Sequence, residues 1–319
     1  MSQVTRSDVV EAADRIGGLV ERTPLMESRI FGNRIWLKCE CLQTGGAFKL
    51  RGATNRLLQL SEAQREAGVV AFSSGNHARG VAIAARRLGI PAVIVMPSDA
   101  PGVKVEGTRG EDAEIVFYDR STQSREEIAG RLAAERGAVV VPSFDDPAIV
   151  AGQGTAGLEI LDQMAEAGEE PPTRIVIPAG GGGLASGVAL ACEAAEIVCV
   201  EPAGWDDMGR SLELGRIVPV DPGAPSTLCD ALQTPRVSPI TFDILQERRA
   251  SAVSVTDAEV GEAMRFAWNH HALTVEPGGA AALAAALGGK AATDGRTVII
   301  VSGGNVDPAL HAQIVGEKG

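Results

Sequence analysis

Short runs of β-branched residues alternate with alanine-rich stretches along most of this 319-residue chain. This alternation is typical of repeated βα units, in which parallel strands form a sheet and helices cover it. Hydrophobic residues make up 45% of the chain and aromatic residues only 3%, which favours close helix-on-sheet packing over a β-sandwich. We therefore predict an α/β fold of parallel twisted sheets flanked by helices. The expected strands are residues 35–39, 69–72, 92–96, 114–117, 138–141, 174–177, 197–201 and 297–301, and the expected helices are residues 48–60, 77–88, 121–136, 146–164, 183–194, 257–270 and 278–287.

The order of these units predicts two lobes with a cleft between them, a place that small-molecule sites favour. We expect residues 1–60 and 146–319 to form a large domain and residues 61–145 to form a small one. Residues 219–239 are rich in Pro, Ser and Asp and show no period. They are expected to form a long irregular excursion that serves as a lid or a subunit contact.

Charge and hydropathy exclude several classes of partner. Asp+Glu number 41 against Lys+Arg 29, and the resulting net charge of -12 argues against nucleic acid. No stretch approaches the ~20 apolar residues of a membrane span, and no basic flank precedes an apolar leader, so we expect a cytoplasmic protein that binds no membrane. The five cysteines are an odd number in apolar segments and are expected to be reduced and buried.

One of the few lysines, Lys49, lies where a glycine loop leads into a helix, in the segment TGGAFKLRGA of residues 44–53. The positive end of the helix dipole disfavours the charged form of a lysine at this place. Such a lysine is helped toward the free amine that covalent catalysis requires. A solvated surface lysine is the alternative interpretation.

Three other turns between strand and helix carry polar or glycine-rich sequences. Residues 180–183 are consecutive glycines, whose N–H groups can converge on one anion at a helix start. This turn lacks the Lys-Ser/Thr ending of a P-loop and lies past the chain midpoint, which disfavours a nucleoside triphosphate or a nicotinamide cofactor. Residues 73–77, SSGNH, can hold a carboxylate or simply cap a helix, and residues 302–305, SGGN, taken alone indicate a plain turn.

An acidic turn follows the expected strand at residues 197–201. The carboxylates of Glu201 and Asp207, with the backbone carbonyl of Trp205, would suit Mg or Ca better than zinc. Helix capping by Asp206 is the competing explanation.

In this order, the Lys49 loop, SSGNH, the glycine turn, the acidic turn, the segment EPGGA of residues 276–280 and SGGN resemble the fold-type II pyridoxal-phosphate enzymes. Within them, the chain is similar to the threonine/serine dehydratase and serine racemase branch. The resemblance runs from Arg22 to Asn305. It implies a two-lobed fold like that of the tryptophan synthase β subunit, a large domain that binds the cofactor, and a homodimer.

The resemblance also assigns expected roles. Lys49 would link pyridoxal 5'-phosphate covalently, and Ser74 is the residue that serves racemases as acid and base. The residues expected to bind the cofactor are Lys49, Phe48, Asn76 (at the 3'-oxygen), Gly180, Gly181, Gly182, Gly183, Leu184, Glu276 and Ser302 (at the pyridine nitrogen). The residues expected to face the substrate are Ser73, Ser74, His77 and Arg79, and the implied ligands of Mg or another divalent cation are Glu201, Trp205 and Asp207.

Two departures from the family pattern stand out. Gly46-Ala47 occupies the place where the usual loop has a serine before Phe-Lys. Arg79 stands where the family commonly has glutamine, and it would either recognise a second substrate carboxylate, as in 3-hydroxyaspartate, or be a surface arginine.

The activity implied is that of an L-threonine/L-serine ammonia-lyase, a carbon–oxygen lyase. It would remove the β-hydroxyl of a hydroxyamino acid as water and give a 2-oxo acid and ammonia. The alternatives are a 3-hydroxyaspartate dehydratase, a serine racemase-like enzyme, or a non-catalytic regulatory subunit that binds a phosphorylated ligand. Retention of Lys49 argues against the last, because a pure binder needs no reactive amine.

Overall fold

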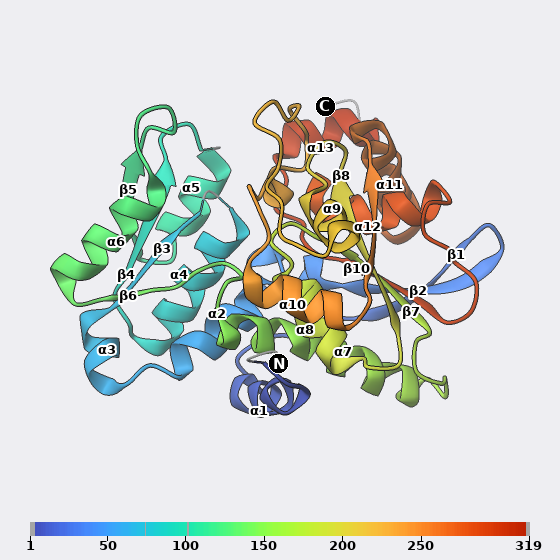
Figure 1. The fold of residues 1–319 in the computed structure, drawn as a ribbon, viewed down its shortest axis with the longest axis horizontal. Helices are drawn as coiled ribbons and strands as arrows, with labels where there is room; N and C mark the ends of the chain where they lie inside the picture. Colours follow the sequence, from blue (N-terminus) through green and yellow to red (C-terminus); the bar gives the residue numbers. More distant parts are fainter. Residues whose placement is uncertain (1–3, 74, 101, 317–319) are drawn as a thin grey trace.

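The computed structural model describes residues 4–73, 75–100 and 102–316, apart from the side chain of Val103. It contains one sheet of strand order β1-β2-β10-β7-β8-β9 and a second of order β5-β4-β3-β6. The two sheets lie in separate lobes, with helices on their faces (Figure 1). The predicted α/β fold is therefore confirmed.

The larger sheet is parallel except for one edge. Strand β1 pairs antiparallel with β2, and β2, β10, β7, β8 and β9 run parallel to one another. The two edge strands were not predicted, because β1 and β9 are partly exposed and lack the continuous apolar run of a buried parallel strand. The strands are β1 (Leu25–Ile30), β2 (Asn33–Cys39), β7 (Arg174–Pro178), β8 (Glu196–Pro202), β9 (Ser251–Val255) and β10 (Thr297–Val301).

The smaller sheet is parallel throughout. Its strands are β3 (Val69–Phe72), β4 (Ala92–Pro97), β5 (Glu114–Tyr118) and β6 (Val139–Val140). All four lie inside the segment expected to form the small domain, whereas the exact domain boundaries at residues 60 and 146 stay a prediction.

The helices begin and end at the residue types that favour such ends. Helix α4 ends at Leu88 and is followed by the cap residue Gly89, whose φ of +66° suits glycine, and α7 begins with Pro147 after an Asp146 cap. Helix α12 consists only of Pro, Gly, Ala and Leu and is buried against β10, β7 and β8. The helices are α1 (Arg6–Ile16), α2 (Lys49–Leu58), α3 (Glu62–Ala67), α4 (Asn76–Leu88), α5 (Gly102–Arg109), α6 (Arg125–Arg136), α7 (Pro147–Glu166), α8 (Gly183–Ala191), α9 (Asp207–Leu214), α10 (Pro239–Glu247), α11 (Asp257–His271), α12 (Pro277–Leu287) and α13 (Pro308–Val315).

Two composition-based expectations can be compared with this structure. All five cysteines are buried and free, as predicted, and burial raises the pKa of the Cys39 thiol to about 12. Of the helices in the described ranges, none has the length and apolarity needed to cross a membrane.

The segment between α9 and α10 is irregular apart from a short turn of 3-10 helix, η3 (Asp230–Leu232), and its second half reaches the cleft.

Candidate active site

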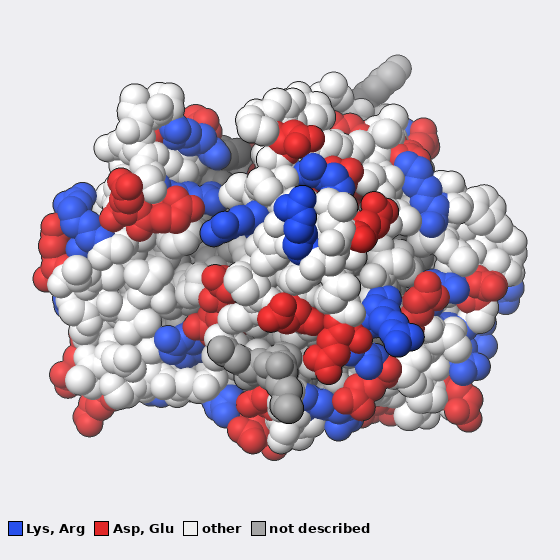
Figure 2. Space-filling model, viewed as in Figure 1, with Lys and Arg blue, Asp and Glu red and all other residues white. Residues whose placement is uncertain are grey.

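A cavity of about 350 Å³ lies between the two lobes, and both sheets contribute to its wall. Ser73 follows β3, the glycine turn follows β7, and Ser302 follows β10. The carboxyl ends of parallel strands meet at one edge of a sheet, which explains why turns far apart in the sequence converge here. On the face drawn in Figure 2, acidic and basic side chains are mixed, and several basic ones lie near the boundary between the lobes.

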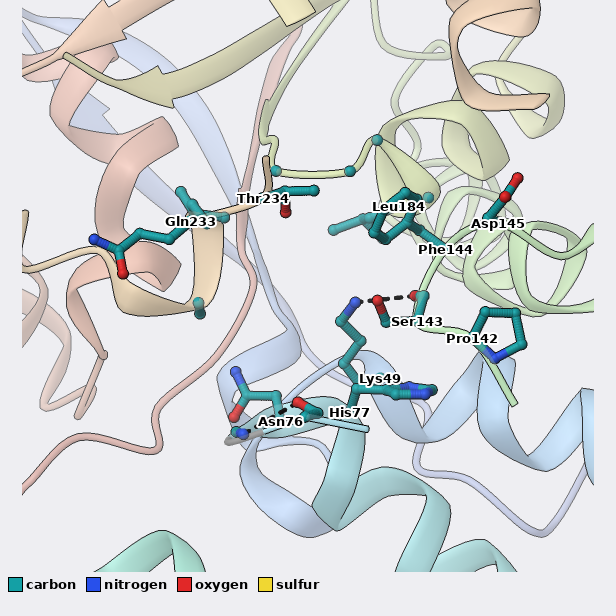
Figure 3. A pocket seen from close by; sticks show the side chains of 18 of the residues that line it. Lys49, Asn76, His77, Pro142, Ser143, Phe144, Asp145, Leu184, Gln233 and Thr234 are labelled. Carbon is teal, nitrogen blue, oxygen red and sulfur yellow. Dashed lines mark hydrogen bonds between the residues drawn. The ribbon is translucent and has the colours of Figure 1, made fainter. Parts of the chain in front are cut away.

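Lys49 is the first residue of α2, and its side chain points into the cavity (Figure 3). Its Nζ donates a hydrogen bond to the carbonyl oxygen of Ser143 at 3.1 Å and lies 5.1 Å from the centre of the Phe48 ring. Burial lowers the pKa of Lys49 to about 8, although the nearby Glu276 opposes the shift. A substantial fraction of the amine is therefore uncharged in mildly alkaline solution.

The glycine turn leads into α8 with no room for larger residues. Gly182 has a φ of +85°, and a Cβ there would lie 2.6 Å from Met208 Cε. Within the described chain, the backbone N–H groups of Gly181, Gly182, Gly183 and Leu184 donate to no acceptor, and no side chain caps the helix. The turn thus presents a row of unused donors at the positive end of a helix, which suits a bound anion.

Three sequence motifs are joined here by a chain of side-chain hydrogen bonds. Arg79 Nη1 donates to Asn305 Oδ1 at 2.9 Å, and Asn305 Nδ2 donates to Asn76 Oδ1 at 2.8 Å. Asn76 Nδ2 in turn donates to Glu276 Oε1 at 2.5 Å. Asn76 is the first residue of α4, after the cap residue Gly75, and its side chain takes part in these hydrogen bonds and does not cap the helix.

Glu276, at the end of this series of hydrogen bonds, and Ser302 both line the cavity. Glu276 is 2% exposed, and its Oε2 is without a hydrogen-bond partner among the described residues. Burial raises the pKa of Glu276 to about 7, against the opposing effect of Lys104. The backbone oxygen of Ser302 accepts from Phe48 N at 3.2 Å, whereas its Oγ has no partner in the described chain.

The residues expected to face the substrate have different surroundings. His77 is buried, its Nε2 pairs with the Val141 carbonyl oxygen at 2.8 Å, and burial lowers its pKa to about 3. The imidazole is therefore neutral, and Nδ1 is left without a partner among the described residues. Ser73 Oγ accepts from Gly75 N at 3.1 Å. Ser74 lies outside the described residues.

Arg79 lines a smaller adjoining cavity of about 110 Å³. Besides Lys49, the larger cavity is lined by the cations Lys104, Arg125 and Arg236, which the sequence did not predict. Lys104 pairs with Asp230 across the cleft, and Arg125 Nε pairs with Glu126 at 2.9 Å. Arg236 is exposed and makes no hydrogen bond or ion pair within the described chain. These residues belong to no motif, so only the fold could place them here.

The acidic turn is used as a helix cap, but by a different residue from the one expected. Both carboxylate oxygens of Glu201 accept backbone N–H groups of α9, from Met208 at 2.8 Å and Gly209 at 2.9 Å, whereas Asp206 makes no capping bond. Asp207 accepts from Val237 N at 2.9 Å. Burial raises the pKa of Glu201 to about 8 and that of Asp207 to about 7.

At this turn Trp205 could offer a cation only its backbone carbonyl oxygen, because an indole N–H is a donor. Trp205 Nε1 donates to the carbonyl oxygen of Pro225 at 2.8 Å. No cluster of three or more His, Cys, Asp or Glu side chains able to hold a metal ion occurs in the described part of the chain. A site made of two carboxylates and the Trp205 carbonyl stays a prediction.

Comparisons with known proteins give consistent results. The family model described as "Pyridoxal-phosphate dependent enzyme" matches residues 16–303. An L-threo-3-hydroxyaspartate ammonia-lyase from Pseudomonas sp is 45% identical over 317 residues, which are 97% of this chain and 97% of the relative. The structure of maize serine racemase has a TM-score of 0.90 at 38% identity and covers 97% of this chain and 96% of its own. An L-threonine ammonia-lyase from Thermotoga maritima is 36% identical over 322 residues, which are 98% of this chain and 79% of the relative.

Proposed function

Because this chain belongs to the pyridoxal-phosphate-dependent enzyme family, we propose that it is an ammonia-lyase for 3-hydroxyaspartate, a hydroxyamino acid with a second carboxylate. The observation that carries this choice is the set of cations Lys104, Arg125 and Arg236 around the cavity of a chain whose net charge is -12. The relative named for this substrate is also 45% identical to the chain. The L-threonine/L-serine activity that the motifs favoured is thereby placed second.

The residues around Lys49 fit pyridoxal 5'-phosphate. The unused N–H groups of the glycine turn suit its phosphate, Asn76 can donate to its 3'-oxygen, and the free Oγ of Ser302 can pair with its ring nitrogen. Lys49 supplies the amine for covalent attachment. When bound, the cofactor withdraws electrons from the substrate Cα and so acidifies the Cα proton.

Within this proposal the chain's own groups hold the substrate and move the proton. The α4 N-terminus, whose cap residue Gly75 offers no side chain, would hold the α-carboxylate together with Ser73. The Nζ of Lys49 would take the Cα proton, since burial keeps part of the amine uncharged. The β-hydroxyl takes up one proton and leaves as water, and the proton that Lys49 removes from Cα balances this uptake. Hydrolysis of the remaining enamine gives the 2-oxo acid and ammonia.

We assign the second substrate carboxylate to Arg236. Lys104 and Arg125 are already paired with Asp230 and Glu126. Arg236 is the cavity-lining cation that has no partner within the described chain. An unpaired guanidinium offers two parallel N–H donors to a carboxylate, which gives both affinity and direction.

Further parts of the proposal concern the cation and the assembly. Glu201, Asp207 and the Trp205 carbonyl would bind a divalent cation such as Mg, which would relieve the cost of burying two neighbouring carboxylates. The homodimer is an expectation from the resemblance, and the cytoplasmic location is an expectation from the hydropathy of the sequence. Membership of an enzyme family sets aside the non-catalytic subunit.

The test is a comparison of substrates with the purified, cofactor-loaded protein. Release of 2-oxo acid would be measured from L-threo-3-hydroxyaspartate, L-threonine and L-serine, and the label left by borohydride reduction would be mapped to Lys49. We expect kcat/KM for the diacid to exceed that for either monoacid by at least about tenfold. A preference for threonine or serine, or racemisation of serine without 2-oxo acid, would contradict the proposal.

A further inference from the structure

We propose that Arg79 is a positioning residue that, together with the carbonyl oxygen of Gly45, fixes the direction of the hydrogen-bond chain from Arg79 through Asn305 and Asn76 to Glu276, so that Asn76 presents a donor to the cofactor site. This inference rests on the proposed cofactor and not on the choice of substrate. It gives a role to an arginine that lines the smaller adjoining cavity and not the larger one.

The direction follows from what each group can do. A guanidinium only donates hydrogen bonds, whereas a carboxamide both donates and accepts. Because Arg79 donates to Asn305 Oδ1, the Nδ2 of Asn305 is left for its other neighbours. Those neighbours are acceptors, namely the carbonyl oxygen of Gly45 at 2.7 Å and Asn76 Oδ1 at 2.8 Å.

The orientation of the Asn76 amide is fixed because its Oδ1 accepts the hydrogen bond from Asn305. Its Nδ2 must point the other way, where it donates to Glu276 Oε1. That nitrogen carries two hydrogens, and the second has no partner within the described chain while Asn76 lines the cavity. A free N–H suits an electron-rich oxygen of the cofactor, whereas a carbonyl oxygen in its place would repel it.

The protonation of Glu276 depends on this direction, because charged groups of both signs lie near its carboxyl group. Lys49 on α2, Lys104 on α5 and Asp230 on η3 are the charged groups that face it, and the neutral thiols of Cys41 and Cys229 lie close by. A donor from Asn76 stabilises the carboxylate form. In the opposite direction Glu276 would have to be protonated to donate to Asn76 Oδ1.

Arg79 itself is held in place by the fold. Its Nε is buried without a partner among the described residues, and its side chain packs beside Gly107 of α5. A glutamine here could donate to Asn305 or accept from it, so the direction at Asn305 would be held by the carbonyl oxygen of Gly45 without help from residue 79. A lysine would still only donate.

The experiment compares Arg79→Gln with Arg79→Lys. The matched control is Arg86→Gln, on the same helix, where the side chain is 54% exposed. The dissociation constant of pyridoxal phosphate would be measured by tryptophan fluorescence without substrate, and the visible absorbance of the bound cofactor would be followed against pH. We expect Arg79→Gln to weaken cofactor binding by about tenfold and to move the absorbance titration upward by about one pH unit. Arg79→Lys and Arg86→Gln should stay within about twofold of the parent protein.

Equal behaviour of the glutamine and lysine variants, or an unchanged glutamine variant, would overturn the inference. Thermal unfolding midpoints would show whether a variant is folded. If Arg79→Gln does not fold, Asn305→Asp provides the second variant. An aspartate there accepts from Arg79 and also draws the Nδ2 of Asn76, so it should reproduce both changes. A parent protein that binds no pyridoxal phosphate would sink the proposed function instead, whereas a failed direction effect leaves the substrate proposal standing.

Discussion

Helix α2 separates two charged regions of the molecule, and the two regions differ in how their charges are satisfied. Arg51, behind the helix, is fully buried and donates to both oxygens of Glu40, at 2.8 and 2.9 Å, and both of Glu159, at 2.6 and 2.8 Å. Lys49, two residues earlier and so on the opposite face, has one hydrogen bond to a carbonyl oxygen. Complete pairing makes the first region structural, and incomplete pairing makes the second reactive.

The neighbourhood of Arg51 shows what complete pairing requires. Lys38 is also fully buried, and its Nζ donates to Glu159 at 2.6 Å, to the carbonyl oxygen of Thr23 at 2.8 Å and to Gln163 at 2.9 Å. Burial lowers the pKa of Lys38, while the nearby carboxylates oppose the shift. Every strong donor in this region has an acceptor, whereas the cavity side keeps donors and acceptors unused.

The largest expected effect comes from removing the reactive amine. Lys49→Ala should lower turnover by at least about 10⁴-fold, because both the covalent link and the base are lost. Its free energy of unfolding in the cofactor-free protein should stay equal or rise, since a buried amine with one partner is removed. Turnover and urea unfolding measured on the same sample would check both statements, and residual activity near that of the parent would contradict the role of Lys49.

Replacing Arg51 in the fully paired region should lower the free energy of unfolding, in contrast to Lys49→Ala. Arg51→Met leaves Glu40 and Glu159 without their main partner and should destabilise the protein by about 3–5 kcal/mol. The matched control is Arg86→Met, which removes an exposed pair with Glu111 at 3.0 Å and should cost no more than about 1 kcal/mol. Equal losses for the two variants in urea unfolding would remove the contrast.

The carboxylate on the reactive side gives a pH-dependent prediction. The pKa of Glu276 is raised from 4.5 to about 7 in the folded state, so between these values only the folded protein keeps the proton. Its contribution to stability is full below pH 4.5 and is lost as the pH rises through 7. Glu276→Gln should reduce this fall, measured on the cofactor-free protein, by about 1–3 kcal/mol. The exposed Glu262→Gln should leave the fall unchanged, and an identical slope in both variants would argue against the raised pKa.

The smallest effect concerns the unpaired cation at the mouth of the cavity. Arg236→Gln should lower kcat/KM for 3-hydroxyaspartate by about tenfold and change that for L-threonine by less than about twofold. Arg86→Gln serves again as the control. Equal losses on the two substrates would mean that Arg236 does not distinguish the second carboxylate.

The sequence predicts the central strands and the site turns for one physical reason. Strands buried on both faces are continuous apolar runs, and the turns at their carboxyl ends converge on one edge of the sheet. Edge strands such as β1 and short amphipathic helices such as α9 and α10 lack such a run and were missed.

The sequence could not predict contacts between distant residues that lie outside any motif. Arg51 and Glu159 are 108 positions apart, and Lys104 and Asp230 are 126 apart. The direction of the chain from Arg79 to Glu276 likewise depends on Asn305, which the motif alone presents as part of a plain turn. Such pairings become visible only when the strand order is known.

Helix α12 has a consequence for how such an enzyme can change over evolutionary time. Ten of its eleven residues, all Pro, Gly, Ala or Leu, are buried against β10, β7 and β8. A larger side chain there would push β10 away, and with it Ser302 at the end of that strand and Glu276 at the start of the helix. The part of the cavity wall that Glu276 and Ser302 form is therefore closed to gradual change from beneath. New substrate ranges would arise at the rim, where an exposed residue such as Arg236 can be exchanged without disturbing the packing beneath it.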